Sequence, residues 1–280
     1  MIAIAVVVVS SAALFALDES VKERLIEADA IVFDGALRRV YHHQRLPVLP
    51  ATVPAPKPNA YAWLEHDGAR IIKHAMGRTP MFSRNSVGAF ENSIAAGYTI
   101  IEGDLRLTTD GDLVCFHGED AKPISTKSYL KAIEKGQQAP CYFSDIANLL
   151  RAHPEVYFVV DAKDDFVATY SSILKIAPDI VRQLIPQLYD FEQIVWVRQH
   201  HFSGALFTSY LSALTTEQMF FYAKETHIEA VTLTEERALK LASVPSNISV
   251  FTHTIDDPIE AGRFLQRGFK GVYSNELPPT

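Results

Sequence analysis

From residue 69 onward, short apolar runs alternate with stretches in which apolar residues recur at helical spacing. The runs have the length and composition of buried strands, and the intervals have the periodicity of amphipathic helices. We predict strands within 69–76, 156–163, 182–189, 204–211, 228–234, 248–255 and 270–276, and a β-hairpin over 99–118. We predict helices over 85–96, 143–152, 166–174, 191–201, 216–225, 235–242 and 258–267. About eight strand candidates separated by helices, without a glycine-rich first turn, favour an α/β fold of the TIM (β/α)8 type over an open doubly wound sheet.

The hairpin over 99–118 carries charged residues on one of its predicted faces. Asp110-Gly111 is a favoured two-residue turn, since both central positions need a positive φ. This turn gives strands Ile100 to Thr108 and Leu113 to His117, and its register pairs Asp104 with His117. One predicted face carries Ile101, Leu105, Leu107, Val114 and Phe116. The other carries Glu102, Asp104, Arg106, Thr108, Cys115 and His117. The hairpin pattern alone is consistent with either a solvated surface or a functional site on this second face.

The chain ahead of the predicted barrel has a different pattern. Ile2 to Leu17 is apolar except for Ser10 and Ser11, and it is shorter than the ~20 residues of a comfortable membrane span. We expect residues 1–17 to be a signal peptide or an N-terminal anchor of an exported protein; a buried element of the domain is the alternative. Residues 18–68 read as a helical segment and a proline-rich stalk, and 69–280 as the TIM-barrel domain.

Composition narrows the class of protein. With 280 residues, 48% of them apolar, the chain can bury a sizeable core. Its formal charge of -7 offers no basic surface for a polyanion, so we expect no nucleic-acid partner. The two cysteines, Cys115 and Cys141, have no metal-ligand spacing, and the sequence leaves open whether they pair.

Polar residues gather where three successive predicted strand regions end, which is the active-site mouth of a TIM barrel. These residues are His74, Glu102, Asp104, His117, Asp161 and Lys163. Three carboxylates without a cysteine cluster suit one divalent cation, Mg²⁺ or Ca²⁺, so we predict Glu102, Asp104 and Asp161 as its ligands. The ion and Lys163 would hold a phosphodiester, while His74 and His117 would act as acid and base.

At these positions the sequence resembles the glycerophosphodiester phosphodiesterases, a family of phosphatidylinositol phospholipase C-like barrels, over most of 69–280. HAMG with Asn85-Ser86 resembles the family's His-Arg-Gly and Asn-Thr helix start, Glu102-Gly103-Asp104 its Glu-x-Asp, and TTDGDLVCFH its Thr-x-Asp-Gly and following His. The resemblance implies a TIM barrel, a metal bound by Glu102, Asp104 and a third acid, and catalysis by His74 and His117. The implied reaction is hydrolysis of a phosphodiester, with glycerophosphodiesters as the expected substrates.

The chain departs from the family pattern at three places. Ala75 stands where the family has Arg, so that phosphate contact is either lost or supplied elsewhere, with Arg78 and Arg84 as candidates. Asp161-Ala162-Lys163 is similar to the Asp-x-Lys of spider-venom sphingomyelinase D enzymes, and His253 stands where the family has Trp. The resemblance thus gives the expected substrate-binding residues, which are Lys163, Asn85, Arg84 and His253. Phospholipase D- or sphingomyelinase D-like cleavage of membrane phospholipids, with membrane association through the N-terminus, and a non-catalytic phosphate-binding barrel remain alternatives.

Overall fold

The computed structural model describes residues 50, 52–66, 70–79, 81–118, 123–202 and 204–279. The predicted signal peptide or anchor, the helical segment and the start of the stalk lie outside these residues. The described residues belong to one compact unit, Pro47–Thr280. Among their helices, none has the length and apolar content needed to cross a membrane.

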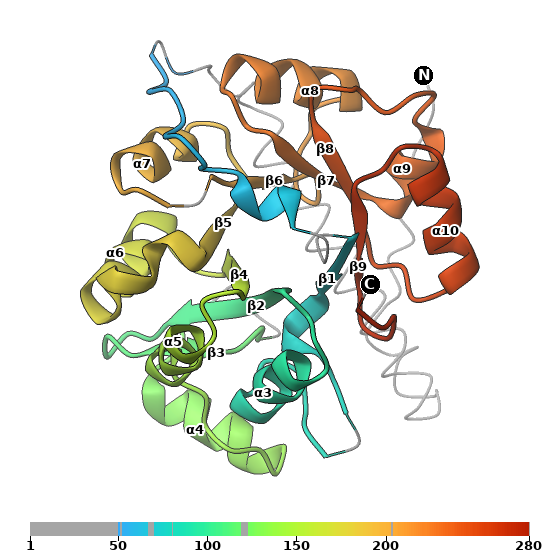
Figure 1. Ribbon diagram of the computed structural model, residues 1–280. Helices are drawn as coiled ribbons and strands as arrows, with labels where there is room; N and C mark the ends of the chain where they lie inside the picture. The colour runs from blue at the N-terminus through green and yellow to red at the C-terminus, as the bar shows by residue number, and fades with distance from the viewer. Residues whose placement is uncertain are drawn as a thin grey trace, which may run out of the picture. The chain divides into compact units, whose positions relative to one another are not determined.

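Nine strands of the described chain form one sheet that closes on itself. Eight of them run parallel, and β1 pairs with both β2 and β9, which closes the barrel (Figure 1). The ninth, β3, is antiparallel to β2. The predicted TIM barrel is therefore confirmed. The strands are β1 Ile71–Lys73, β2 Ile100–Leu107, β3 Leu113–Cys115, β4 Tyr157–Ala162, β5 Leu184–Leu188, β6 Leu206–Thr208, β7 Ala230–Thr234, β8 Ser249–His253 and β9 Gly271–Ser274.

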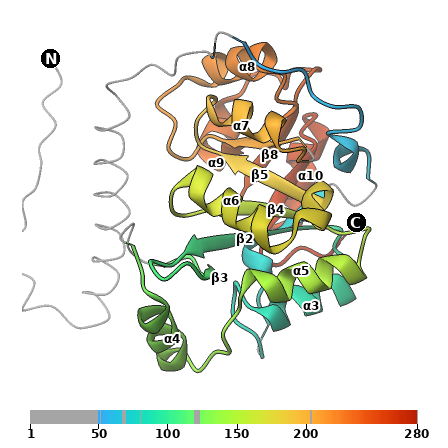
Figure 2. The ribbon, with the colours of Figure 1, turned by 90° about the vertical axis from the view of Figure 1, so that its left-hand side faces the viewer.

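Helices surround the strands in Figure 1, and each predicted helix is present within a few residues of its expected bounds. They start where side chains cap the first turn: Thr215 and Gln218 form a capping box ahead of α8, and Asp257 caps α10. One helix, α4, was not predicted; it follows β3 and lies beside it in the side view (Figure 2). The α-helices are α3 Val87–Ala95, α4 Thr126–Lys135, α5 Phe143–Ala152, α6 Phe166–Ile176, α7 Gln193–Gln199, α8 Thr216–Glu225, α9 Glu235–Lys240 and α10 Pro258–Gln266.

The barrel has an inner and an outer apolar layer, because successive side chains of a strand point to opposite faces. The outer layer packs the strands against the helices. The inner cluster takes residues from around the barrel, namely Ile72, Ile100, Val159, Ile185, Leu206, Ala230, Phe251 and Tyr273. The 3₁₀ helix η1, Ala62–Glu65, joins this cluster through Trp63, whose ring centroid lies 6.0 Å from that of Phe251. The packed barrel thus includes residues ahead of 69, where the predicted stalk ended.

The register of the β2–β3 hairpin differs from the prediction by one residue. Leu105 pairs with Cys115 and Arg106 with Val114. Gly111 takes a φ of 94° and donates to the carbonyl of Thr108, which makes a three-residue loop closed by a left-handed glycine. A shift of one residue exchanges the faces of a strand. Cys115 accordingly lies in the outer core and Val114 packs under α4, so the predicted cross-strand pairing of Asp104 with His117 is wrong.

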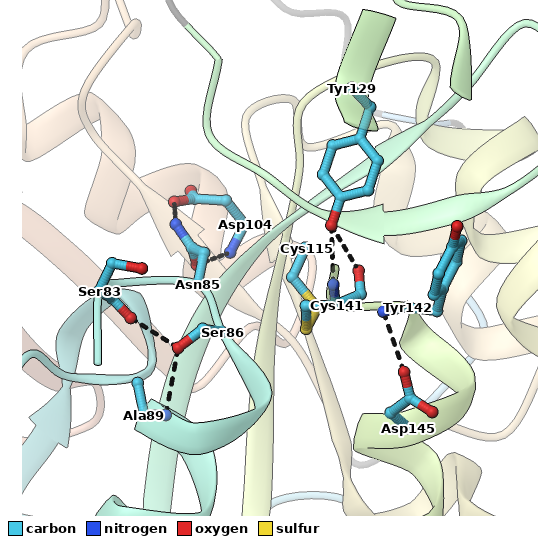
Figure 3. The surroundings of a disulfide bond; sticks show 10 residues. All are labelled: Ser83, Asn85, Ser86, Ala89, Asp104, Cys115, Tyr129, Cys141, Tyr142 and Asp145. Carbon is cyan, nitrogen blue, oxygen red and sulfur yellow. Dashed lines mark hydrogen bonds between the residues drawn. A yellow bond between two sulfur atoms is a disulfide. The ribbon is translucent and has the colours of Figure 1, made fainter. Parts of the chain in front are cut away.

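Cys115 and Cys141 form a disulfide, which settles the pairing left open by the sequence (Figure 3). Both residues are buried, and the Cys115 amide donates to the Cys141 carbonyl at 2.9 Å. The hydroxyl of Tyr129 in α4 donates to that carbonyl at 3.1 Å and accepts from the Cys141 amide at 2.8 Å. The disulfide and Tyr129 therefore link β3, α4 and the start of α5. Within this link, Cys115 lies two residues ahead of His117.

Candidate active site

Three buried carboxylates meet at the carboxyl ends of β2 and β4. Glu102 and Asp104 lie two residues apart on β2, and the register pairs Asp104 with Asp161 on β4. Ile100 and Val159 belong to the inner cluster. Because alternate residues of a strand share a face, Glu102, Asp104 and Asp161 also point into the barrel. One ligand oxygen from each carboxylate lies within 4.8 Å of the others. The structure therefore brings together the three predicted metal ligands.

Gly103, between Glu102 and Asp104, faces the outer layer at close quarters. A Cβ atom there would lie 2.6 Å from Cε of Met76 and 2.9 Å from the ring of Phe158. Met76 is itself fully buried and holds a φ of 61°. Glycine at this position lets β2 pack tightly while its two neighbours present carboxylates on the inner side.

Lys163 pairs with two of the three carboxylates. Its Nζ lies 2.8 Å from Oδ1 of Asp104 and 2.7 Å from Oδ2 of Asp161. Burial lowers the pKa of Lys163, but Asp161 and Asp104 outweigh it and raise that pKa overall, so the ammonium is charged. Burial would likewise raise the pKa of Asp104, yet Lys163 and His117 lower it. One lysine against three carboxylates leaves an excess of negative charge in the cluster.

Glu102 is the carboxylate whose pKa is raised in this negatively charged cluster. Burial, followed by repulsion from Asp104 and Asp161, raises its pKa well above the usual range. Its Oε2 accepts a 2.7 Å hydrogen bond from the amide of Ala75, which holds a left-handed φ of 48° just after β1. A divalent cation among the three oxygens would remove the repulsion, and an all-oxygen donor set suits Mg²⁺ or Ca²⁺. The residues present thus fit the predicted ion.

Asn85 supports Asp104 from the loop ahead of α3 (Figure 3). Its Nδ2 donates to Oδ2 of Asp104 at 2.6 Å, and its Oδ1 accepts from the Asp104 amide at 3.0 Å. Asn85 holds a φ of 52°, a conformation that asparagine tolerates better than most residues. In this structure the predicted substrate-binding Asn85 orients a metal-ligand candidate.

His74 follows β1 and faces the carboxylates. Its Nε2 lies 4.0 Å from Oε2 of Glu102, and its Nδ1 lies 2.9 Å from Oδ1 of Asn275, which follows β9. The Nδ2 of Asn275 donates to Asp256 at 2.9 Å, so the amide oxygen is the group that faces His74. Nδ1 of His74 must then carry the proton, which leaves the Nε2 lone pair toward the cluster. Burial lowers the pKa of His74, although the Asn275 hydrogen bond opposes that shift.

His117 is exposed and follows β3, with Nδ1 2.7 Å from the carbonyl of Gly118. Its charge contributes to the lowered pKa of Asp104, so it lies within electrostatic reach of the carboxylate cluster. The structure therefore brings His117 to the site from the loop after β3, although the predicted strand pairing is absent.

The two other predicted residues, Arg84 and His253, each interact electrostatically with His74. Arg84 is exposed, and its charge lowers the pKa of His74. His253 ends β8 and is 8% exposed; burial, followed by the charges of His74 and Lys163, lowers its pKa. Direct contacts thus link Glu102, Asp104, Asp161, Lys163, Asn85 and His74, whereas the catalytic and substrate-binding roles of the predicted residues stay predictions.

Sequence reasoning assigned no role to three side chains at this mouth. The hydroxyl of Tyr189, after β5, donates to both oxygens of Asp161, at 2.8 and 3.0 Å. Asn275 and Asp256 fix the tautomer of His74 from the end of β9, the strand that pairs with β1, and from the segment after β8. The available signal was their position in the chain, since Tyr189 and Asn275 stand at the ends of the predicted strands 182–189 and 270–276 and Asp256 directly follows 248–255.

Comparison with known proteins finds a family model that matches the first part of this site. Residues 75–135 match the model of the glycerophosphoryl diester phosphodiesterase family. The predicted family resemblance is confirmed. The glycerophosphoryl diester phosphodiesterase match contains Glu102, Asp104 and His117, and it runs from the residue after His74 to the end of α4. No curated protein sequence matches the chain.

Solved structures of glycerophosphodiester phosphodiesterases share the fold. One from Thermotoga maritima is 17% identical with a TM-score of 0.57, covering 75% of this chain and 96% of its own. One from Parabacteroides distasonis is 14% identical with a TM-score of 0.61, covering 75% and 93%. An Oleispira antarctica phosphodiesterase, solved with the product sn-glycerol-3-phosphate, is 14% identical with a TM-score of 0.59, covering 77% and 95%. At these identities the likeness concerns the barrel, and the site rests on the residues of this chain.

Proposed function

We propose that this barrel is a divalent-metal-dependent phosphodiesterase that hydrolyses glycerophosphodiesters. The observation that carries the proposal is the buried cluster of Glu102, Asp104 and Asp161, whose ligand oxygens lie within 4.8 Å beside Lys163 and His74. The match of residues 75–135 to glycerophosphoryl diester phosphodiesterases supports the reaction class. A Mg²⁺ or Ca²⁺ ion held by the three carboxylates would supply positive charge that stabilises a phosphoryl group.

Lys163 can serve this phosphoryl group directly. An ammonium has three N–H donors, and Asp104 and Asp161 take two of them. The third is available to a phosphoryl oxygen in the same place. Lys163 would therefore bind the substrate's negative charge while it bridges the two carboxylates.

The two histidines divide the proton transfers. The unprotonated Nε2 of His74 can accept a proton from the attacking water or hydroxyl, because Asn275 keeps the proton on Nδ1. His117, exposed at the mouth, is the group we assign to protonate the leaving alcohol. The base must start unprotonated and the acid must start protonated. The ring of His74 is largely buried and that of His117 is exposed, so the two rings lie in different environments.

A substrate panel tests the proposal. The purified protein is assayed with glycerophosphodiesters, sphingomyelin and lysophospholipids, with identification of the products, alongside His74→Ala and His117→Ala variants. We expect glycerol 3-phosphate and a free alcohol from glycerophosphodiesters, and a loss of about 10²- to 10⁴-fold in kcat for each variant. Release of a headgroup from the lipids alone would support the phospholipase D-like alternative. Phosphodiester binding without turnover in any assay would support the non-catalytic alternative.

We also propose that the protein is exported, with its N-terminal apolar segment as a signal peptide or membrane anchor. The buried disulfide supports this proposal, since disulfides persist in oxidising compartments. Mass analysis of the N-terminus after expression in the native host would distinguish cleavage from retention. Recovery of the intact, reduced protein from the cytosol would contradict export.

A further inference from the structure

A buried histidine with no hydrogen-bond partner stands beside the candidate active site. His253 ends β8 and is 8% exposed, and neither Nδ1 nor Nε2 meets a partner among the described residues. Phe251, two residues earlier, belongs to the inner cluster, so His253 points into the barrel mouth. The charges of His74 and Lys163 act on the imidazole, so it lies within electrostatic reach of the groups that would handle the phosphate.

The imidazole is neutral. Burial, with added repulsion from His74 and Lys163, lowers the pKa of His253 to about 3. A neutral imidazole has one N–H donor and one nitrogen acceptor. A hydroxyl group also combines both functions, whereas an apolar group satisfies neither and leaves the buried nitrogens unpaired.

Two aromatic rings flank the imidazole. The ring centroid of Tyr210 lies 4.1 Å from that of His253, and the centroid of Tyr273 lies 5.5 Å away. Tyr273 is buried, whereas Tyr210 is 57% exposed in the segment after β6. Of the two flanking rings, Tyr210 is therefore the one exposed to solvent.

We propose that His253 selects a substrate alcohol that carries a free hydroxyl close to the phosphodiester, and that this hydroxyl displaces the Tyr210 ring from the imidazole. This inference rests on the proposed phosphodiesterase function and names the chemical feature that the site recognises. Loss of a hydroxyl from such a substrate leaves a buried polar group unpaired, and sites of this kind discriminate strongly against the deoxy analogue.

A pair of substrates and three variants test the inference. Glycerophosphocholine and n-propyl phosphocholine have the same phosphodiester and headgroup, and they differ in the two hydroxyls. The ratio of their kcat/KM values is measured for the wild type, His253→Phe, His253→Gln and Thr252→Val. The Thr252→Val variant is the matched control, because it removes an unpartnered buried hydroxyl from the same strand without touching the inner face.

We expect the wild type and Thr252→Val to prefer the hydroxylated substrate and His253→Phe to reduce that preference by about 5- to 100-fold, through loss on glycerophosphocholine. His253→Gln, which restores a donor and an acceptor, should retain part of the preference. Circular dichroism checks that each variant is folded, and the Gln variant keeps the test decisive if Phe disrupts folding.

The possible results separate the inference from the function on which it rests. Turnover of both substrates with an unchanged ratio in folded His253→Phe and His253→Gln overturns the inference and leaves the function standing. Equal turnover of the two substrates by the wild type would also overturn the inference and leave the function standing. No turnover of either substrate by the wild type overturns the proposed function, and the inference fails with it.

Discussion

Asn275 accepts a hydrogen bond from Nδ1 of His74 at 2.9 Å while its own amide nitrogen donates to Asp256 at 2.9 Å. Asp256 also accepts hydrogen bonds from Oγ of Ser274 and from the amide of Asn275, both at 2.7 Å. The carboxylate thus anchors the end of β9 and fixes which way the Asn275 amide faces. The tautomer of His74 is therefore set from outside the carboxylate cluster.

Replacing Asn275 should change both the rate and its pH dependence. Asn275→Leu removes the acceptor for Nδ1–H, and we expect kcat to fall about 10- to 100-fold, as for other residues that orient a reacting group. The native pKa of His74 is lowered by burial, so its neutral form and the activity should be lost only as the pH falls below the usual histidine range. Asn275→Asp adds a negative charge that favours the imidazolium, so the acidic limb of kcat/KM should move to higher pH.

The measurement is kcat/KM against pH for the wild type and both variants. An acidic limb that stays at the same pH in Asn275→Asp would show that His74 is not the group titrating there. Ser128→Ala, at an exposed position of α4, is a control for general effects of mutation.

Lys163 should stabilise the metal-free protein. It is 21% exposed at the side chain and is paired with Asp104 and Asp161, so Lys163→Met leaves two buried carboxylates without their cation. We expect a loss of about 3–5 kcal/mol in the free energy of unfolding in EDTA. Millimolar Mg²⁺ or Ca²⁺ should recover part of this loss. Urea unfolding with and without the ion measures both effects, and Lys175→Met, at an exposed site in α6, provides the matched control.

Equal destabilisation of the Lys163→Met and Lys175→Met variants would contradict this reading of the cluster. So would a variant whose stability does not respond to either ion, because the account places the lysine and the cation among the same carboxylates.

The disulfide should contribute to stability through the chain that it closes. Cys115 and Cys141 are 26 residues apart, for which the loop-closure model gives about 3.5 kcal/mol. We expect the free energy of unfolding of Cys115→Ala/Cys141→Ala to be lower by about this amount, so that the variant unfolds at a lower denaturant concentration. Because β3 leads directly to His117, kcat should also fall. Identical unfolding curves for the wild type and the double variant would contradict the disulfide's structural role, and dithiothreitol should affect the wild type alone.

The fold could be predicted because its signal is local and repeated. Runs such as 156–163 are apolar on both faces and bounded by helical intervals, and α5 and α8 begin and end where periodicity predicts. The helix α4 was missed because it has few apolar residues, of which Tyr129 and Ile133 are buried. Its partner surface is β3, which the sequence does not reveal.

The site was predictable as far as strand ends identify it. Glu102, Asp104 and Asp161 follow from alternation along two strands. The hairpin register could not be predicted in the same way, because Asp110-Gly111 fits both a two-residue turn and a three-residue loop. The φ of Gly111 in the structure decides between them. Tyr189 and Asn275 act through contacts between strands far apart in the sequence, so their roles required coordinates.

The most direct test of the central claim is metal activation of phosphodiester hydrolysis in the wild type and Glu102→Gln. Both proteins are stripped with EDTA and assayed with glycerophosphocholine during titration with Mg²⁺ or Ca²⁺. The account predicts that the wild type loses activity in EDTA and regains it with one of the ions, whereas Glu102→Gln needs far more metal or stays inactive. Full activity of the wild type in EDTA, or identical metal titrations for the two proteins, would contradict the assignment of the three carboxylates as the metal site.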